Sequence, residues 1–254
     1  MQDLADKTIL ITGGAGGLGS AAVALFIEQG ARVVISDLNA HAGTALAAHY
    51  GKQAAFVEHD VTDEAAWAHT MDFVAQQFGR LDVLINNAGI LQSGNIETAT
   101  LAQWRQLMQV NADSCFLGCQ HGILAMKAHG GSIVNVASVA SWMPMQDFPA
   151  YGASKAAVAS LTRTAALHCR KKGYGIRVNS LHPDGIYTPM MQASAPGITP
   201  EQILFDPARN PKGRARMPED IARLLVFLAS DAAQAVSGCA LQADNAILGM
   251  GLWP

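Results

Sequence analysis

Tyr151 and Lys155 place a phenol and an ammonium four positions apart, in the run YGASK at residues 151–155. Pro149 just before this run favours the start of a helix, and four positions on a helix bring both side chains to one face. A phenol with a pKa of about 10 is only ~0.1% ionised at pH 7, and a cation beside it stabilises the phenolate. The pair is therefore a candidate for general acid–base chemistry, although a Tyr and a Lys at this spacing also arise by chance.

Ser138 lies upstream of this pair, just after the run SIVNV at residues 132–136, which has the pattern of a buried strand. Open α/β sheets bind their ligands at the carboxyl ends of strands. The helix carrying Tyr151 would begin close enough for the two hydroxyl groups to flank one carbonyl oxygen. Ser138 alone could be an ordinary turn residue, but with Tyr151 and Lys155 it indicates proton transfer at an alcohol or ketone.

A glycine-rich turn lies between the first expected strand and the first expected helix, and it reads TGGAGGLG at residues 12–19. It satisfies both a G-x-G-x-x-G and a T-G-x3-G-x-G spacing. Glycines let the backbone approach a pyrophosphate, and the helix N-terminus presents free N–H groups to the anion. For this motif taken alone, a purely structural turn is the alternative.

Asp37 ends the second expected strand about 20 residues after the turn, where a carboxylate can accept both hydroxyls of an adenosine ribose. By itself, Asp37 could equally be a helix cap or a turn residue. No Lys or Arg occurs in the glycine turn or at residues 38–40, and Arg32 lies too early on the strand to compensate. A 2′-phosphate would meet a carboxylate without a counter-charge, so the sequence predicts NAD rather than NADP.

Strands and helices are expected to alternate along the whole chain, which indicates βαβ crossovers and a parallel sheet covered by helices on both faces. The sequence thus predicts one α/β domain over residues 1–254, a doubly wound Rossmann fold with a seven-stranded parallel sheet. The expected strands are Thr8–Thr12, Ala31–Ser36, Ala54–Val57, Val83–Asn86, Ser132–Val136, Gly175–Leu181 and Ala240–Gln242, and the first two helices are Ala21–Gln29 and Ala40–Tyr50.

One irregular, proline-containing region interrupts this alternation at Pro183–Arg216. Long connections of this kind in α/β enzymes are usually functional, often as lids. We therefore interpret residues 186–216 as a lid over a substrate site.

Composition excludes several classes of function. With 50% hydrophobic and 15% charged residues the chain is globular, and its net charge of −3 gives no footprint for nucleic acid or an anionic membrane. No apolar run approaches the roughly 18 residues of a membrane span, and the first seven residues are acidic where a secretory signal is basic. The four cysteines form no C-x-x-C pair and no metal pattern. We expect a cytoplasmic protein without metal, nucleic-acid partner or membrane.

Taken together, the motifs resemble the short-chain dehydrogenase/reductase family over essentially the whole chain. The matching residues are Thr12-Gly13-x3-Gly17-x-Gly19, Asp60-Val61, Asn86-Asn87-Ala88-Gly89, Asn111, Ser138 and Tyr151-x3-Lys155. The resemblance implies a Rossmann fold and a homotetramer.

The same resemblance implies roles for the catalytic residues. Tyr151 would be the general acid/base, and Ser138 would orient and polarise the substrate oxygen. Lys155 would lower the pKa of Tyr151 and hold the nicotinamide ribose, and Asn111 would support a water that links Lys155 to solvent. Without the other motifs, Asn111 would be an ordinary polar helix residue.

The resemblance also implies a set of residues that contact NAD, drawn from the glycine turn, the strand ends and the start of the lid. These are Thr12, Gly13, Gly17, Leu18, Gly19, Asp37, Leu38, Asp60, Val61, Asn87, Ala88, Gly89, Tyr151, Lys155, Pro183, Ile186 and Thr188.

Two stretches depart from the family's usual pattern. Where Pro-Gly is usual after the sixth strand, residues 182–191 read HPDGIYTPMM, and where Asp-Gly-Gly is common near the end, residues 243–251 read ADNAILGMG. Both are similar to the bacterial 3β/17β-hydroxysteroid dehydrogenase branch, which implies NAD-linked oxidation of a ring hydroxyl on a steroid. Asp184 replaces a small residue near the nicotinamide, and the sequence assigns it no role.

Adaptable methionines and flat aromatic rings near the expected site suit a bulky apolar alcohol or ketone. They are Trp142, Met143, Met145, Phe148, Met190, Met191, Ile198, Ile203, Leu204 and Phe205. The same residues could instead belong to the core or to a subunit interface. A dehydrogenase of other bulky or cyclic secondary alcohols is one alternative function. A non-catalytic NAD-binding sensor is another, but it would not need Ser138, Tyr151 and Lys155 together.

Overall fold

A seven-stranded, wholly parallel sheet forms the centre of the computed structural model, which describes residues 4–249. The strands run in the order β3-β2-β1-β4-β5-β6-β9, which confirms the predicted doubly wound fold. Their bounds are β1 Thr8–Thr12, β2 Arg32–Asp37, β3 Ala54–Glu58, β4 Val83–Asn86, β5 Gly131–Val136, β6 Ile176–Pro183 and β9 Ala240–Ala243. The order reverses between β1 and β4, and ligands bind at such a switch point.

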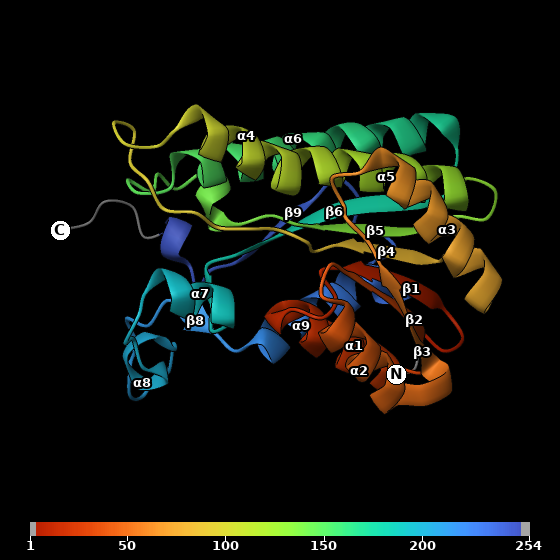
Figure 1. The fold of residues 1–254 in the computed structure, drawn as a ribbon, viewed down its shortest axis with the longest axis horizontal. Helices are drawn as coiled ribbons and strands as arrows, with labels where there is room; N and C mark the ends of the chain where they lie inside the picture. The colour runs from red at the N-terminus through yellow and green to blue at the C-terminus, as the bar shows by residue number, and fades with distance from the viewer. Residues whose placement is uncertain (1–3, 250–254) are drawn as a thin grey trace.

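Helices cover both faces of the sheet (Figure 1). One layer holds α1 (Gly17–Glu28), α2 (Ala40–Tyr50) and α9 (Pro218–Ala229), and the other holds α3 (Glu64–Phe78), α4 (Leu101–Met108), α5 (Ser114–Met126) and α6 (Pro149–Lys172). Strand periodicity sends neighbouring residues of β1 to opposite cores. Ile9 and Ile11 pack with α1 and α9, while Leu10 packs with residues of α3 and α5.

The first helix begins at Gly17, four residues earlier than the predicted Ala21. Glycine has poor helix propensity, so the sequence pattern delays the start. The helix nevertheless forms there, and the Ser20 N–H closes its first turn on the Gly16 carbonyl at 2.7 Å. The helix N-terminus therefore lies inside the glycine turn. The predicted bounds of the seven strands agree with the observed bounds to within a residue or two.

The region Pro183–Arg216 was predicted to be irregular. The structure shows instead that it contains short helices and strands. Two short helices, α7 (Pro189–Ser194) and α8 (Pro200–Ile203), lie between β7 (Gly185–Ile186) and β8 (Ala215–Arg216), which pair in parallel. Each helix has a proline in its first turn and a threonine before it, a combination that starts a helix without help from apolar periodicity.

Candidate active site

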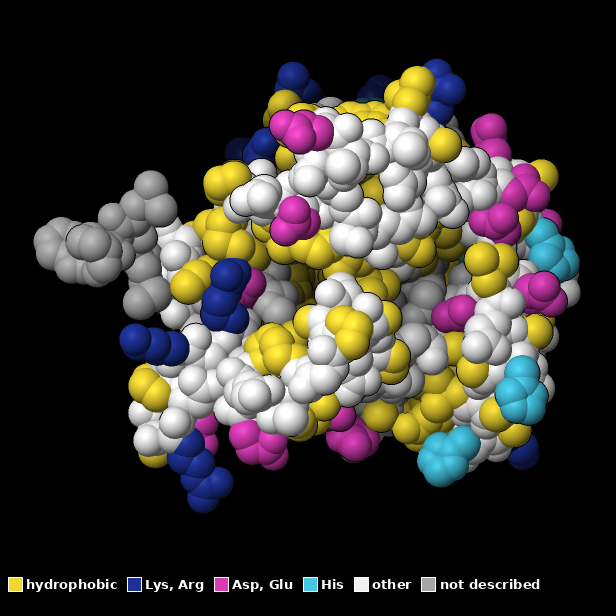
Figure 2. All heavy atoms as spheres, turned by 60° about the vertical axis from the view of Figure 1, so that its left-hand side comes forward, with side chains coloured by type: hydrophobic (Ala, Val, Ile, Leu, Met, Phe, Trp, Pro, Cys, Tyr) yellow, Lys and Arg dark blue, Asp and Glu magenta, His cyan; other side chains and the backbone are white. Residues whose placement is uncertain are grey.

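A cavity of about 660 Å³ lies at the carboxyl ends of the strands. Figure 2 looks onto this end of the molecule and shows hydrophobic side chains gathered around a hollow. The wall comes from the glycine turn, the residues that follow β2 to β6, the start of α6, and α7. Its volume is that of a small-molecule site, and its position is the one at which open parallel sheets bind ligands.

Nearly all of the residues predicted for the site line this cavity. They are Gly13, Gly17, Leu18, Gly19, Asp37, Leu38, Val61, Asn87, Ala88, Gly89, Ser138, Tyr151, Lys155, Pro183, Ile186 and Thr188. The predicted residues Thr12, Asp60 and Asn111 are absent from its lining. The side chain of each of these three residues is hydrogen-bonded within the protein. Thr12 and Asn111 bond to residues distant in the chain, and Asp60 bonds within its own turn.

Thr12 joins the ends of two strands. Its hydroxyl oxygen accepts the N–H groups of Asn87 and Ala88, both at 3.0 Å. Asp60 stabilises its own turn, because its carboxylate accepts the Thr62 N–H at 2.9 Å and the Thr62 hydroxyl at 2.7 Å. The prediction that these side chains contact a cofactor therefore finds no support in the cavity lining, since both are occupied in holding the backbone beside it.

The glycine turn leaves the N-terminus of α1 free to bind an anion. Gly16 stands at the cap position with no side-chain cap, and the first turn holds no acidic residue. A Cβ at Gly19 would collide with the carbonyl oxygen of Gly13, so only glycine allows this approach. Unpaired N–H groups of the first helical turn attract phosphate groups. The turn thus fits the pyrophosphate of a dinucleotide.

Asp37 stands at the rim of the same cavity, at the end of β2. Its carboxylate accepts the Ala15 N–H at 3.0 Å and the Asn39 N–H at 2.9 Å. Arg32 is occupied at the other end of the strand, where it donates to the Asp6 carbonyl at 2.8 Å. Among the described residues, Lys155 is the only Lys or Arg that lines the cavity. Asp37 therefore has no cation beside it that could receive a phosphate.

Tyr151 and Ser138 both line the cavity. The helix α6 begins at Pro149, as predicted, and carries Tyr151 in its first turn. Ser138 follows β5 in an extended conformation, and its hydroxyl oxygen accepts the Ala140 N–H at 3.2 Å. Burial raises the pKa of Tyr151 above its ordinary value, and a hydrogen bond with Ser138 offsets part of that rise. The two hydroxyls form one polar spot in a largely apolar wall.

Lys155 lies buried next to Tyr151, one turn further along α6. Its Nζ donates to the Val136 carbonyl at 2.9 Å and lies 5.7 Å from the centroid of the Tyr151 ring. Burial lowers the pKa of Lys155 to about 8. Burial and Ser138 account for the shifted pKa of Tyr151, and the role of Lys155 in stabilising the phenolate stays a prediction.

Asn111 lies on a π-helical turn, Gln109–Asp113, between α4 and α5. Its side-chain oxygen accepts the Ile90 N–H at 2.8 Å, and its nitrogen donates to the Ile90 carbonyl at 3.0 Å and to Ser154 at 3.1 Å. A Cβ at Gly89 would lie 3.2 Å from the Asn111 oxygen and 3.5 Å from Lys155 Nζ. Asn111 thus holds the loop after β4 against the catalytic helix, and π turns recur at such sites.

Comparison with known proteins agrees with this geometry. A family model described as "Enoyl-(Acyl carrier protein) reductase" matches residues 13–246. The 3-beta-hydroxysteroid dehydrogenase of Comamonas testosteroni is 56% identical, over 98% of this chain and 98% of that protein. The chain belongs to the short-chain dehydrogenase/reductase family. The resemblance found in the sequence is confirmed.

Two further relatives in this family carry names with a different cofactor or substrate. An NADP-dependent (R)-specific alcohol dehydrogenase of Lentilactobacillus kefiri is 37% identical, over 95% of this chain and 96% of that protein. A trans-4-hydroxycyclohexanecarboxylate dehydrogenase of Sinomonas cyclohexanicum is 36% identical, over 95% of this chain and 93% of that protein. Membership of the family therefore fixes neither the cofactor nor the substrate.

Two histidines beside the short-chain dehydrogenase site were not singled out from the sequence. His59 follows β3 and lines the cavity, with Nδ1 2.8 Å from the Ser36 hydroxyl. His182 lies behind Ser138, with Nδ1 3.0 Å from the Ser138 carbonyl and Nε2 2.8 Å from the Ser180 hydroxyl. Burial lowers the pKa of each to about 4. Their position at strand ends is the signal that could have indicated them.

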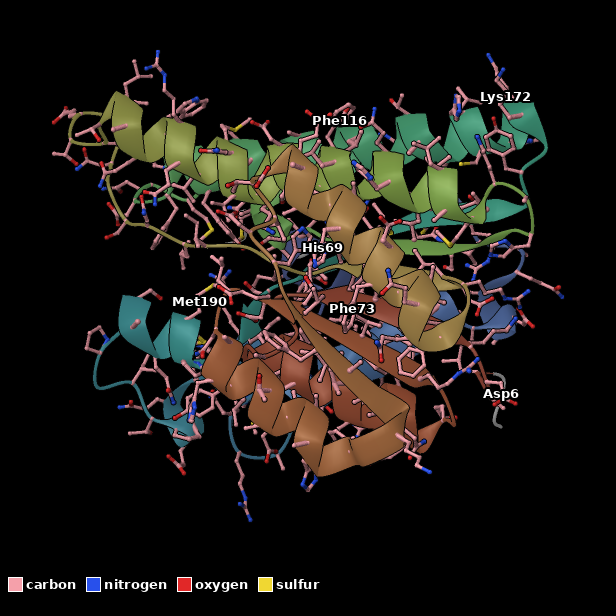
Figure 3. The ribbon with its side chains drawn as sticks, turned by 45° about the vertical axis from the view of Figure 1, so that its right-hand side comes forward. Asp6, His69, Phe73, Phe116, Lys172 and Met190 are labelled. Carbon is pink, nitrogen blue, oxygen red and sulfur yellow. The ribbon has the colours of Figure 1, made fainter. Side chains whose placement is uncertain are left out.

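Only some of the apolar residues predicted for the substrate site line the cavity. Of the candidates, Met145, Phe148, Met190 and Met191 line it. Figure 3 shows Met190 projecting from α7. Trp142 instead stacks on His182 at 4.2 Å between ring centroids. The cavity lining also omits Met143, Ile198, Ile203, Leu204 and Phe205.

Within residues 4–249, no helix is long and apolar enough to cross a membrane. No group of three or more His, Cys, Asp or Glu side chains in that range is placed to hold a metal ion.

Proposed function

We propose that this chain is an NAD-dependent dehydrogenase that interconverts a secondary alcohol and a ketone on a steroid-sized ring system, with 3β/17β-hydroxysteroids as the substrate class. The observation that carries the proposal is that Ser138, Tyr151 and buried Lys155 line one largely apolar cavity, with Lys155 Nζ 5.7 Å from the centroid of the Tyr151 ring. The hydroxysteroid dehydrogenase of Comamonas testosteroni supports the substrate class.

The residues then divide the reaction among them. Ser138 donates a hydrogen bond to the substrate oxygen, and Tyr151 takes the hydroxyl proton in oxidation and returns it in reduction. Lys155 would hold the nicotinamide ribose and stabilise the phenolate, and Asn111 would support a water that links Lys155 to solvent. The bound nicotinamide would accept or supply the hydride.

Oxidation should accelerate as pH rises from 6 to 9. Burial raises the pKa of Tyr151, so its base form is scarce at neutral pH and grows with every step toward alkali. Ketone reduction consumes the protonated form and should favour the acid side. A flat oxidation profile, with chemistry shown to limit the rate, would contradict the role of Tyr151.

The choice of NAD rests on Asp37 and on the lack of a Lys or Arg near it among the cavity residues. The glycine turn would hold the pyrophosphate, and Asp37 would accept the ribose hydroxyls. The NADP-dependent relative from Lentilactobacillus kefiri makes a direct measurement necessary.

We also propose a single domain over residues 1–254 that forms a homotetramer and resides in the cytoplasm. Exposed apolar side chains on the outer helices support assembly: Phe116 and Leu124 on α5 and Leu167 on α6 are each more than half exposed. Figure 3 shows Phe116 on the outer side of the upper helical layer. All four cysteines are free, as is usual in a reducing compartment.

The deciding experiment follows NADH formation with 3β-, 17β- and 3α-hydroxysteroids, beside cyclohexanol. The proposal expects kcat/KM for a 3β- or 17β-hydroxysteroid to exceed that for cyclohexanol, with Ser138→Ala as the inactive control. Preference for cyclohexanol would favour the alternative of a general cyclic-alcohol dehydrogenase. Tight NAD binding without turnover of any alcohol would favour a non-catalytic sensor.

A further inference from the structure

The segment between β7 and β8, residues 187–214, forms one wall of the cavity and is here named the lid. Its two ends lie side by side, because β7 and β8 pair with each other. The Gly185 N–H donates to the Arg214 carbonyl at 3.1 Å, and the Tyr187 N–H donates to the Arg216 carbonyl at 2.9 Å. Arg214 is the last residue of the lid, and Arg216 is the last residue of β8.

Asp184 holds the first of these arginines. The Asp184 carboxylate accepts Nε and Nη2 of Arg214, both at 2.8 Å, in a two-pronged ion pair. Only 9% of the Asp184 side chain is exposed, and the residue lines the cavity. Its own N–H donates to the Ala243 carbonyl of β9 at 3.2 Å. Asp184 thus ties the returning end of the lid to the sheet.

Asn245 holds the second arginine. Its side-chain oxygen accepts Nε of Arg216 at 2.9 Å and Nη2 at 2.6 Å. The same guanidinium lies 4.5 Å from the centre of the Phe205 ring, inside the lid. Asn245 and Ala246 have φ angles of 51° and 67°, a left-handed conformation that favours glycine. A side chain is therefore kept at position 245 where glycine would be less strained.

A backbone hydrogen bond from the Phe205 N–H to the Ala215 carbonyl, at 2.9 Å, also holds the lid, but neither of its two helices, α7 and α8, contains a buried residue. At the start of the lid, the Thr188 side chain packs closely against the glycine turn. A Cβ added at Gly17 would lie only 2.8 Å from Thr188 Cγ2. Segments with few buried apolar contacts open at low free energy, so polar contacts at their base decide how often they do so.

We propose that Asp184 and Asn245 are positioning residues that brace the lid over the substrate through Arg214 and Arg216, and thereby set the preference for bulky ring alcohols. The two stretches of sequence that depart from the family's usual pattern thus serve one device. The claim that the braces set the substrate preference rests on the proposed function. The claim that they hold the lid closed does not.

The test uses two variants and a matched control. Asp184→Asn removes the charge of the ion pair, and Asn245→Gly removes the contact with Arg216 while relieving backbone strain. Ala246→Gly relieves the same kind of strain next door and keeps both braces. Because Asn245→Gly introduces no new strain, it remains informative if Asp184→Asn fails to fold.

Two readouts are measured on each purified protein. Trypsin cleaves the lid after Arg209 and Lys212, which are exposed, and its rate reports lid opening without any substrate. Steady-state oxidation of a 3β-hydroxysteroid and of cyclohexanol with NAD reports KM and kcat for a large and a small alcohol.

We expect both brace variants to speed lid cleavage at least about tenfold, as loss of a charge-assisted contact implies. KM for the steroid should rise more than KM for cyclohexanol, and Ala246→Gly should match the wild type in both readouts. Unchanged cleavage in the brace variants, or equal acceleration in Ala246→Gly, overturns the brace. Faster cleavage with equal KM changes for both alcohols overturns its role in substrate preference. A wild type that oxidises neither alcohol refutes the proposed function, while the cleavage rates still decide the brace.

Discussion

The strand-end site and the lid face the same cavity but are built differently. Behind the glycine turn and the loop of Asn87 stand β1 and β4, whose residues are all buried, and β5, which leads to Ser138, is buried except at Gly131. The lid helices α7 and α8 bury no residue, and polar contacts at Asp184 and Asn245 hold their base. In the proposed function, chemistry would rest on the buried part of the fold, and the choice of substrate would rest on the part with few buried contacts.

Tyr151→Phe should separate the two regions most strongly. The ring remains and the proton-transfer group is lost, so kcat should fall by at least about 10²–10⁴-fold for the steroid and for cyclohexanol alike. NAD affinity, measured by fluorescence titration, should stay near the wild-type value. A variant that keeps more than about a tenth of the activity rules out Tyr151 as the general acid/base.

Asp37→Ala tests the cofactor side of the rigid region. The carboxylate offers charge-assisted hydrogen bonds of about 1.5–3 kcal/mol to the ribose hydroxyls and repels a 2′-phosphate. The wild type should prefer NAD over NADP by at least about 100-fold in kcat/KM, and Asp37→Ala should bring the ratio near unity. Adding Leu38→Arg should invert it. Equal use of both cofactors by the wild type refutes this assignment.

Acid should weaken the strand-end region through two buried histidines. The pKa of His59 and of His182 is lowered from 6.5 to about 4. The unfolded chain therefore binds protons between pH 6.5 and pH 4 that the folded chain does not. The contribution of each histidine to the free energy of unfolding is fully present above pH 6.5. Lowering the pH from 7 to 5 should reduce that free energy by about 2 kcal/mol per histidine.

Urea unfolding at the two pH values measures this loss. His59→Gln should reduce the pH dependence more than His41→Gln, because His41 is exposed and is not among the groups that shift the pKa of either buried histidine. An equal slope in both variants would show that His59 titrates alike in the folded and unfolded states.

A matched pair of glycine substitutions should give the smallest effects and compare the regions directly. In Gly19→Ala the new Cβ collides with the Gly13 carbonyl, so NAD affinity should fall about tenfold or more. Gly197 lies in the lid at φ 84° with open space around it, so Gly197→Ala should cost only about 1 kcal/mol of local strain. NAD titration of both variants checks this, and equal losses would contradict the difference between the regions.

Local patterns in the sequence were sufficient for the sheet and for most of the candidate site. Parallel strands buried on both faces are continuous apolar runs, and each is followed by the residues that reach its carboxyl end. Ser138, Tyr151 and Lys155 could be predicted because each stands at a fixed step from such a run. The start of α1 at Gly17 could not be predicted, because glycine has poor helix propensity and the first turn of α1 contains two glycines.

By itself, then, the sequence determined the parallel sheet, the phosphate-binding turn and the set of proton-transfer groups, because these depend on periodicity and short spacings. Only the tertiary structure decided the tasks of Thr12, Asn111, Asp184 and Asn245. Each of them bonds to a residue distant in the chain: Asn87, Ile90, Arg214 and Arg216, respectively. Such pairings leave no local pattern, since they form only when the fold brings separate strand ends together.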